Sequence, residues 1–233
     1  MPPSRLEWHC TSTDVLKFEG SLLAANGRLF GGLDAVHTGV CAAGGSYQTS
    51  SLDDRIFVVN ETNGSWGKAT KLRRTDHAVN SISCAAAGEC AAGGAVAGGQ
   101  GFVVNETNSK WGRAIEVPGT LNSGHGAEVD SISCAAAGNC AAGGTYTDSH
   151  GHGHEQVFVI SETNGHWGRA IEVPGTARLH SQYDPARISI SCAAAGDCAA
   201  GGYVHGRRGL PHAFVVSETS GRWAKAIQVF PAQ

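Results

Sequence analysis

Residues 131–144 read SISCAAAGNCAAGG, and residues 157–176 continue the same block with VFVISETNG and HWGRAIEVPGT. Close copies of this block restart at Ser81 and Ser189, and a degenerate first copy begins near Gly32. A block that recurs along a chain indicates a repeat architecture, in which each copy folds as one supersecondary unit. The 233 residues are therefore expected to form a single domain built from four repeats.

Each repeat contains four short strand-like segments joined by turn residues. In the third copy the first three segments are residues 131–135, 140–146 and 156–162, and the fourth starts at Trp167 and ends before Pro174. Asn164 and Gly165, between the third and fourth segments, tolerate the positive φ angles of a tight hairpin turn. The sequence thus predicts an all-β fold, a β-propeller of four repeats with four antiparallel strands per blade. The rival β-sandwich does not explain why one meander occurs four times.

The repeats are expected to span about residues 31–75, 76–124, 125–180 and 181–233, within one propeller domain that covers 1–233. Residues 1–30 depart from the pattern. Trp8 lies in phase with the repeated tryptophans, so this segment is expected to supply a spare outer strand that pads the ring or pairs with another subunit. Ala35 stands where the other copies have a first cysteine, and we expect its hairpin to be distorted.

Two resemblances follow from these residues. Four blades of roughly fifty residues resemble, in size and number, the four-bladed propellers of the hemopexin type, although no hemopexin sequence motif occurs. The repeat text SxSCAxAGxCAAGG, followed by FVVSETNGxWGxAIEVPGT, is similar to repeats of secreted actinobacterial proteins of undetermined function. This second resemblance covers about 200 residues and implies no catalytic residue.

Six of the eight cysteines form three matching pairs, each with five residues between the partners. This spacing suits two facing positions of a hairpin, whereas a zinc site needs closely spaced ligands that converge. We therefore expect the disulfides Cys84–Cys90, Cys134–Cys140 and Cys192–Cys198, with Cys10 and Cys41 left to clasp the N-terminal segment to the first repeat. Disulfides favour an oxidising compartment and a secreted protein, although the start of this chain does not read as a signal peptide.

Charge and hydropathy exclude two classes of partner. The formal net charge is −3 and only 16% of the residues are charged, so the basic patch of a nucleic-acid-binding protein is not expected. No apolar run approaches the ~20 residues of a membrane-spanning helix. We therefore expect neither nucleic acid nor membrane as a partner.

Three sets of residues recur in every copy and are expected to serve the scaffold. The tryptophans should pack between neighbouring blades. The glutamates should serve the adjacent turn or form surface ion pairs with the repeated bases, which contribute little to stability. The tryptophans are Trp66, Trp111, Trp167 and Trp223, the glutamates are Glu61, Glu106, Glu162 and Glu218, and the bases are Lys68, Arg113, Arg169 and Lys225.

The connections between the second and third segments, and those between repeats, differ in length and composition and should emerge on one face of the domain. Loops on a rigid scaffold commonly carry function, so a ligand is expected there. Tyrosines and arginines in or near these connections suit a carbohydrate or another small polar ligand. The candidate ligand-binding residues are Tyr47, Tyr146, Tyr203, Arg207 and Arg208. By strand alternation, Tyr203 should point to the opposite side from Tyr146.

Histidines are enriched in the same connections and suggest a divalent transition metal as a possible cofactor. One candidate site is the tract of His150, His152 and His154, and another is a set from three inter-repeat connections, His77, His125 and His180. The alternative is a solvated loop that holds no metal ion. Three functions stay open: a carbohydrate- or small-ligand-binding module, a metal-dependent enzyme (lyase, cyclase or hydrolase), and an interaction scaffold that forms homo-oligomers.

Overall fold

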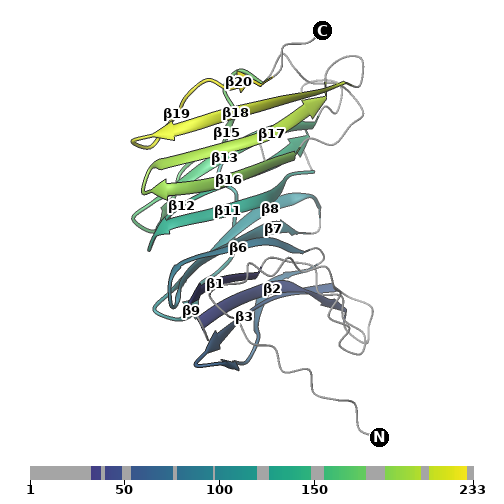
Figure 1. The fold of residues 1–233 in the computed structure, drawn as a ribbon. Coiled ribbons are helices and arrows are strands. Elements are labelled where there is room, and N and C mark those ends of the chain that lie inside the picture. Colours follow the sequence, from purple (N-terminus) through teal and green to yellow (C-terminus); the bar gives the residue numbers. More distant parts are fainter. Residues whose placement is uncertain are drawn as a thin grey trace, which may run out of the picture.

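The computed structural model of the chain describes residues 33–37, 40–48, 54–75, 78–96, 98–119, 126–147, 155–176, 187–205 and 210–229. Every helix or strand in these ranges is a β-strand, and the strands form four antiparallel sheets (Figure 1). The predicted all-β class is therefore confirmed. No helix long and apolar enough to cross a membrane occurs in the described part of the chain.

Each sheet is made of consecutive strands, and we number the sheets 1 to 4 in chain order. Sheet 1 contains β1 (Leu33–His37), β2 (Val40–Gln48), β3 (Asp54–Thr62), β4 (Ser65–Trp66) and β5 (Thr70–Thr75). Sheet 2 contains β6 (Val79–Ala86), β7 (Glu89–Val96), β8 (Gln100–Thr107), β9 (Lys110–Trp111) and β10 (Ile115–Glu116). Sheet 3 contains β11 (Glu128–Ala136), β12 (Asn139–Thr147), β13 (Glu155–Thr163), β14 (His166–Trp167) and β15 (Ile171–Glu172). Sheet 4 contains β16 (Arg187–Ala194), β17 (Asp197–His205), β18 (Pro211–Thr219), β19 (Arg222–Trp223) and β20 (Ile227–Gln228).

The prediction of four strands per repeat is wrong at the outer edge, where two short strands replace one long strand. In sheet 3, β14 and β15 both pair with β13 but are separated by three residues. At this break the N–H of Ala170 donates a 2.8 Å hydrogen bond to the carbonyl of Pro118, which follows β10 of sheet 2. The outer strand is interrupted at the same point in sheets 1 to 4, and in sheet 3 the break lets Ala170 bond to the neighbouring repeat.

The hairpin turns and disulfides follow the sequence prediction. Asn164 and Gly165 have φ angles of 51° and 81°, as a two-residue turn requires. Disulfides join Cys84 to Cys90, Cys134 to Cys140, and Cys192 to Cys198, each across directly paired strand positions. Cys41 is also disulfide-bonded, whereas Cys10 lies outside the described residues.

The first hairpin has the register of its disulfide-bonded equivalents. Ala35 pairs with Cys41, as Cys134 pairs with Cys140, and both hairpins show a register shift one position later. The expected distortion is therefore absent from the described strands of this hairpin. Since the same register occurs with and without two cysteines, the short turn and the strand pairing are sufficient to set it.

The sheets pack face to face, and each inner sheet has two buried faces. We call the face toward the next sheet in the chain the forward face, and the other the backward face. In sheet 2, Val103 on the forward face packs toward sheet 3, while Phe102 and Val104 on the backward face pack against Ile56 and Val58 of sheet 1. Phe158 and Phe214 repeat the role of Phe102 in sheets 3 and 4. The core is therefore a series of equivalent interfaces.

The first strands of the repeats, β1, β6, β11 and β16, lie side by side along the inner edge of the array. Serine hydroxyls join them, because Ser81 Oγ accepts a hydrogen bond from the N–H of Ile132, and Ser131 Oγ accepts one from Ile190. Gly144 on β12 lies so close to this edge that an added Cβ would be 2.0 Å from the carbonyl oxygen of Glu128. The Gly-Gly pair of the repeat thus permits this tight approach.

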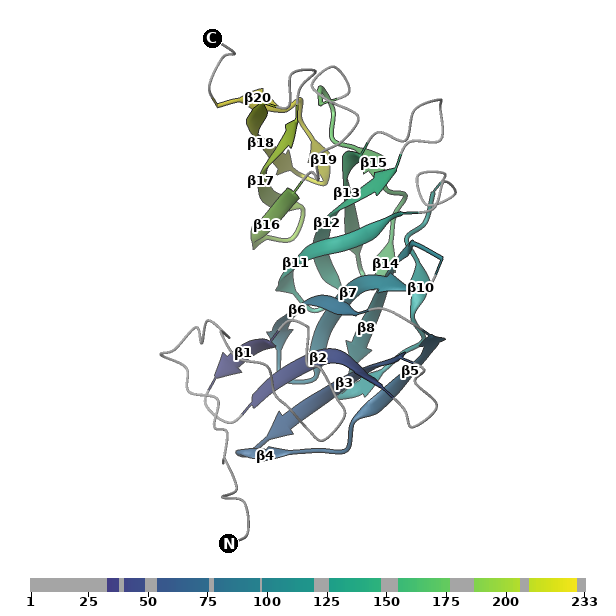
Figure 2. The same ribbon diagram turned by 90° about the vertical axis from the view of Figure 1, so that its right-hand side faces the viewer.

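Sheets 1 and 4 lie at opposite ends of the row of sheets (Figures 1 and 2). Every close sheet-to-sheet contact between described strands joins consecutive sheets. This face-to-face packing of meander sheets is consistent with a propeller-like architecture. The number of blades and the closure into a ring remain predictions, as do the repeat boundaries.

Candidate functional site

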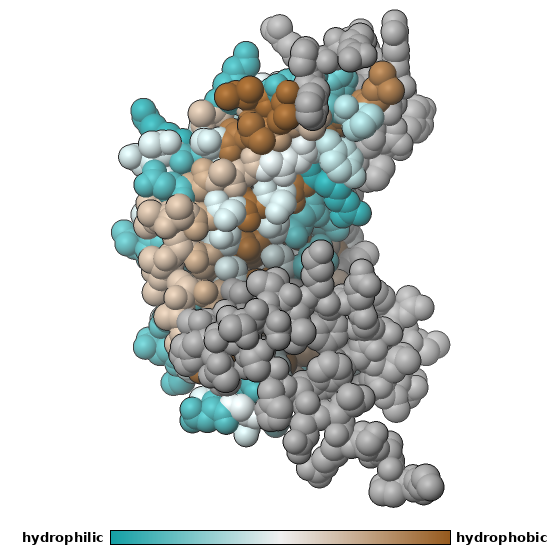
Figure 3. Space-filling view, in the orientation of Figure 1, coloured by the Kyte–Doolittle hydropathy of each residue, from teal (hydrophilic) through white to brown (hydrophobic). Residues whose placement is uncertain are grey.

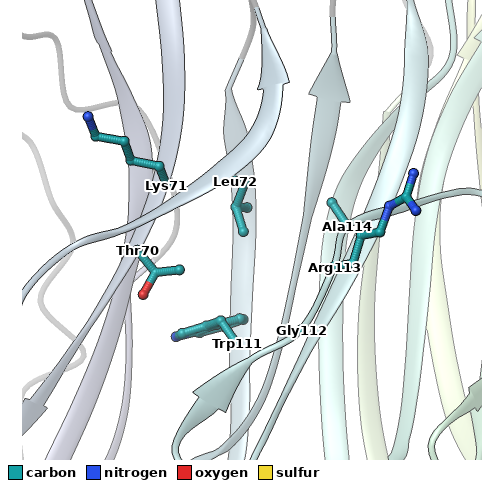
Figure 4. Close-up of a pocket in the computed structure, with 7 residues that line it drawn as sticks. All are labelled: Thr70, Lys71, Leu72, Trp111, Gly112, Arg113 and Ala114. Carbon is teal, nitrogen blue, oxygen red and sulfur yellow. The ribbon is translucent and has the colours of Figure 1, made fainter.

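A groove with a volume of about 580 Å³ lies between the outer strands of sheets 1 and 2 (Figure 4). We call it the first groove. The side chains of Leu72 and Trp111 face its middle, whereas Lys71 and Arg113 direct their charged ends away from each other. Its lining residues are Thr70, Lys71, Leu72, Trp111, Gly112, Arg113 and Ala114.

An equivalent second groove, of about 290 Å³, lies between sheets 2 and 3. Trp167 takes the place that Trp111 has in the first groove, and Gly112 and Arg113 line both grooves. The grooves are therefore produced by the repeat itself. Both lie along the outer strands rather than at the variable connections, where the sequence predicted a ligand.

A hydrogen bond to the preceding sheet holds each groove tryptophan in place. Trp111 Nε1 donates to Asn60 Oδ1 at 2.9 Å, and Trp167 Nε1 donates to Asn105 Oδ1 at 2.8 Å. Both indoles are partly buried, so part of each ring stays accessible. The prediction that the tryptophans pack between sheets is confirmed at these positions, and the fixed rings also form part of the groove walls.

The repeated glutamates were expected to serve the adjacent turn or to form surface ion pairs with the repeated bases, and the expected surface ion pairs are wrong at Glu106 and Glu162. Glu106 and Glu162 are 2% and 3% exposed and accept hydrogen bonds from Asn60 and Asn105 of the preceding sheet. Burial raises the pKa of both carboxyls, and the asparagine hydrogen bonds partly oppose that rise. The glutamates form a buried polar link between sheets because their side chains point into the interface.

The three predicted tyrosines do not form one site. Tyr146 is 5% exposed, packs with Phe158 in the core, and donates a hydrogen bond to Glu172 at 3.1 Å. Tyr47 is partly exposed, and the Lys71 ammonium lies 5.9 Å from the centre of its ring. Val204, the next residue along β17, packs in the core between sheets 3 and 4, so the Tyr203 side chain points to the other face of sheet 4. Among the three tyrosines, Tyr47 therefore lies beside a residue that lines the first groove, Lys71.

The other predicted site residues lie outside the described part of the chain. They are Arg207, Arg208, His77, His125, His180, His150, His152 and His154. In the described ranges, no three His, Cys, Asp or Glu side chains are grouped so that they could hold a metal ion. His212, which is described, lies 2.9 Å from the amide of Gln228 through Nδ1. The metal sites remain predictions.

Asp130 was not selected from the sequence. It lies on β11, the inner strand of sheet 3, and burial together with the negative charges of Glu128 and Glu155 raises its pKa to about 7, against a smaller lowering by Arg187. Its Oδ2 atom has no hydrogen-bond partner. In the structure, Asp130 is the extra residue at a register shift between Val129 and Ser131, and the sequence alone does not mark this position.

No protein-family model and no curated protein matches this chain. Solved structures with weak similarity include an arginine-to-alanine triple mutant of AofleA from Arthrobotrys oligospora, at 12% identity and a TM-score of 0.47, which covers 87% of this chain and 57% of that one. The GH43B protein of a Bacteroides ovatus xyloglucan locus has 13% identity and a TM-score of 0.43, and covers 90% of this chain and 46% of that one.

The catalytic domain of a GH62 alpha-L-arabinofuranosidase from Coprinopsis cinerea has 12% identity and a TM-score of 0.42, over 88% of this chain and 72% of that one. The chain spans 26% to 59% of the length of the first four solved structures that it matches. All these TM-scores are below 0.5, and they establish neither the fold nor the function of this protein.

Proposed function

We propose that the protein is a binding protein for a carbohydrate or another small polar ligand, and that the ligand lies in the grooves between the outer strands of consecutive sheets. The observation that carries this proposal is the first groove, where Trp111 is fixed by its hydrogen bond to Asn60 and Arg113 is exposed beside it. Its volume of about 580 Å³ lies in the usual range of small-molecule sites.

The groove combines the two kinds of contact that a sugar ring uses. The partly exposed indole of Trp111 offers an apolar surface against which the C–H face of a sugar packs. Arg113 and the Thr70 hydroxyl add polar groups to the lining of the same groove, and a guanidinium can pair with carboxylate or sulfate. An aromatic wall with a few polar groups favours a neutral or acidic carbohydrate over an apolar ligand.

Repetition of the groove supports binding of an extended ligand. The second groove again has a tryptophan, Trp167, and shares Arg113 with the first. Two weak sites on one rigid scaffold bind a polymer with a higher apparent affinity than either site alone, because the second contact is intramolecular. A polysaccharide, or a surface that displays many copies of one sugar, fits this arrangement better than a single free monosaccharide.

The test is a printed array of neutral and acidic glycans, followed by calorimetry with the free oligosaccharide that binds best. Arg113→Ala should weaken binding about tenfold, because Arg113 lines both grooves. Lys110→Ala is the matched control, since it also removes one exposed positive charge but does not line either groove. Affinity that is unchanged in Arg113→Ala, or an array to which the protein does not bind, would contradict the proposal.

A further inference from the structure

The outer edge of the row of sheets is more basic than the chain as a whole. We define the outer strip as the four segments that run from each repeated tryptophan to the end of the outer strand, at residues 66–75, 111–116, 167–172 and 223–228. These segments hold seven Lys or Arg and two Glu, whereas the whole chain has 17 Lys or Arg and 20 Asp or Glu. Positive charge is therefore concentrated on one edge of a molecule whose formal net charge is −3.

One base of the outer strip occupies the same backbone position in every repeat, two residues after the tryptophan. The residue before this base donates its N–H to the third strand of its own sheet, as Gly168 does to Ser161 at 2.9 Å. In sheets 3 and 4 the residue after the base donates its N–H to the preceding repeat, as Ala226 does to Pro174 at 2.7 Å. These hydrogen bonds hold the backbone on both sides of the base. The four bases are Lys68, Arg113, Arg169 and Lys225.

The four bases are exposed and have no partner of opposite charge in the described part of the chain. The glutamates expected to pair with them are buried, and Glu106 and Glu162 accept hydrogen bonds from the preceding sheet instead. No hydrogen bond or ion pair joins the side chain of any of the four bases to another described residue. Glu172, one of the two glutamates of the outer strip, accepts a hydrogen bond from Tyr146. The bases are therefore available to an anionic ligand.

Exposed isoleucines lie two residues after the base in sheets 2 to 4. Ile115 and Ile171 are each 42% exposed, and Ile227 is 68% exposed. In the second groove, Arg113 and Ile115 of sheet 2 line the same space as Trp167 of sheet 3. A cation, an aliphatic side chain and an indole around one groove suit a ligand that has both an anionic group and a C–H face. An acidic sugar has both.

The outer strip continues from sheet to sheet. Its outer strands β5, β10, β15 and β20 follow one another in chain order along the row (Figure 2). Arg113 lines both the first and the second groove, so neighbouring grooves share a base. Between sheets 3 and 4, a Cβ added at Gly175 would be 2.9 Å from Cγ of Lys225, so this side chain lies over the end of the preceding repeat. A long ligand can therefore contact bases of successive sheets.

We propose that the outer strip binds an acidic polysaccharide that crosses the row of sheets, with its sulfate or carboxylate groups paired to the four bases and its sugar rings against the grooves. This inference rests on the proposed binding function, and it adds the charge of the ligand and the bases outside the two grooves. One base per sheet, at the roughly 10 Å spacing of packed sheets, is far less dense than duplex DNA, which has about one charge per 1.7 Å. A polymer of acidic sugars is therefore favoured over nucleic acid.

A second exposed surface, on sheet 4, differs from the outer strip in its chemistry. Val215 on the forward face is 46% exposed, and Figure 3 shows hydrophobic residues gathered over β17 and β18, in the upper part of the view. Binding to this surface would depend on apolar contact, which added salt does not screen, whereas salt weakens the pairing of exposed charges. The salt dependence of binding therefore distinguishes the outer strip from this surface.

The first experiment compares charged and neutral polymers of the same backbone by biolayer interferometry with the full chain. The pairs are dextran sulfate with dextran, and polygalacturonate with its methyl ester, and single-stranded poly(dT) is a third probe. At least one charged polymer should bind about tenfold more tightly than its neutral partner, and raising NaCl from about 50 to 500 mM should weaken this binding about tenfold or more. Equal binding within both pairs, or tighter binding of poly(dT) than of either acidic polymer, would overturn the inference. Binding of neutral glycans through Arg113 without salt dependence would overturn this inference alone and leave the proposed function intact.

A second experiment separates the outer strip from the two grooves. Arg169→Ala removes a base of the strip that lines neither groove, so the grooves alone predict an unchanged affinity, whereas the strip predicts a loss of about three- to tenfold for the charged polymer. Arg169→Lys keeps the charge and should retain most of the salt-dependent binding. Lys110→Ala is the matched control, since it removes an exposed positive charge outside the strip. If Arg169→Ala and Lys110→Ala are both folded by circular dichroism and bind the charged polymer equally well, the inference is wrong.

Discussion

Asn105 connects two side chains of the following sheet, because its Oδ1 accepts a hydrogen bond from Trp167 and its Nδ2 donates one to Glu162. One amide thus satisfies an indole and a buried carboxylate across an interface. Asn60 has the same two partners in the previous interface, Trp111 and Glu106. The interface is therefore defined by paired polar groups as well as by apolar packing.

Asn105→Leu should destabilise the protein by roughly 2–4 kcal/mol, since it leaves the Trp167 N–H and the Glu162 carboxylate without this partner. Asn105→Ser should cost much less, because Ser161 makes both equivalent bonds in the next interface. Urea unfolding followed by tryptophan fluorescence measures the difference. Equal stabilities for the two variants would show that the hydrogen bonds contribute little.

Gly144→Ala should be strongly destabilising, because the new Cβ would lie 2.0 Å from the carbonyl oxygen of Glu128 and the inner strand would have to shift. Gly168→Ala is the matched control, since Ala224 occupies the equivalent position in sheet 4 and makes the same backbone hydrogen bond. Thermal unfolding should show a fall of several degrees in Tm for Gly144→Ala alone. A small effect at Gly144 would mean that the inner strands are less tightly packed.

Asp130→Asn should make the protein more stable at pH 8 than the wild type. The pKa of Asp130 is 3.8 in a model peptide and about 7 in the folded protein, so the native state holds this proton more tightly. Protonated Asp130 therefore makes its full contribution to the free energy of unfolding below pH 4. This contribution falls by up to ~4 kcal/mol as the pH rises to about 7. Urea unfolding from pH 4 to 8 should therefore show a flatter profile for the variant. Parallel profiles would contradict the raised pKa.

Replacing Cys134 and Cys140 together by alanine should cost about 2 kcal/mol, because the disulfide closes a short loop in the unfolded chain. The hairpin should keep its register, as β1 and β2 do with Ala35 opposite Cys41. Hydrogen exchange of the β11 and β12 amides checks the register, and urea unfolding gives the cost. Loss of protection along both strands would show that the disulfide itself holds the pairing.

The parts of this fold that could be predicted are those that leave a pattern within a short stretch of the sequence. The strand predicted at residues 140–146 lies within β12 (Asn139–Thr147). The predicted cysteine pairs are the observed disulfides, because the spacing of two cysteines within a hairpin indicates that they occupy facing positions. The break in the outer strand was missed, because residues 168–170 read as ordinary strand and the bonding partner of Ala170 lies in another repeat. Partners in a different repeat leave no local pattern in the sequence.

The candidate site was harder to predict for the same reason. Tyr146 was predicted to bind a ligand because it lies near a variable connection, yet strand alternation places its ring in the core between sheets 2 and 3. The groove around Trp111 and Arg113 belongs to the repeated part of the sequence, which we expected to be scaffold. Its shape depends on how far apart two neighbouring sheets lie at their outer edges, and sequence spacing within one repeat does not contain that distance.

The hydrogen bonds between sheets also have a direction. At every formed interface the asparagine or serine belongs to the earlier sheet and the glutamate and tryptophan to the later one, as with Ser161, Glu218 and Trp223. A repeat duplicated in the middle of the chain would therefore meet a compatible donor before it and a compatible acceptor after it. Such an array can grow by internal duplication while its two ends stay chemically unchanged.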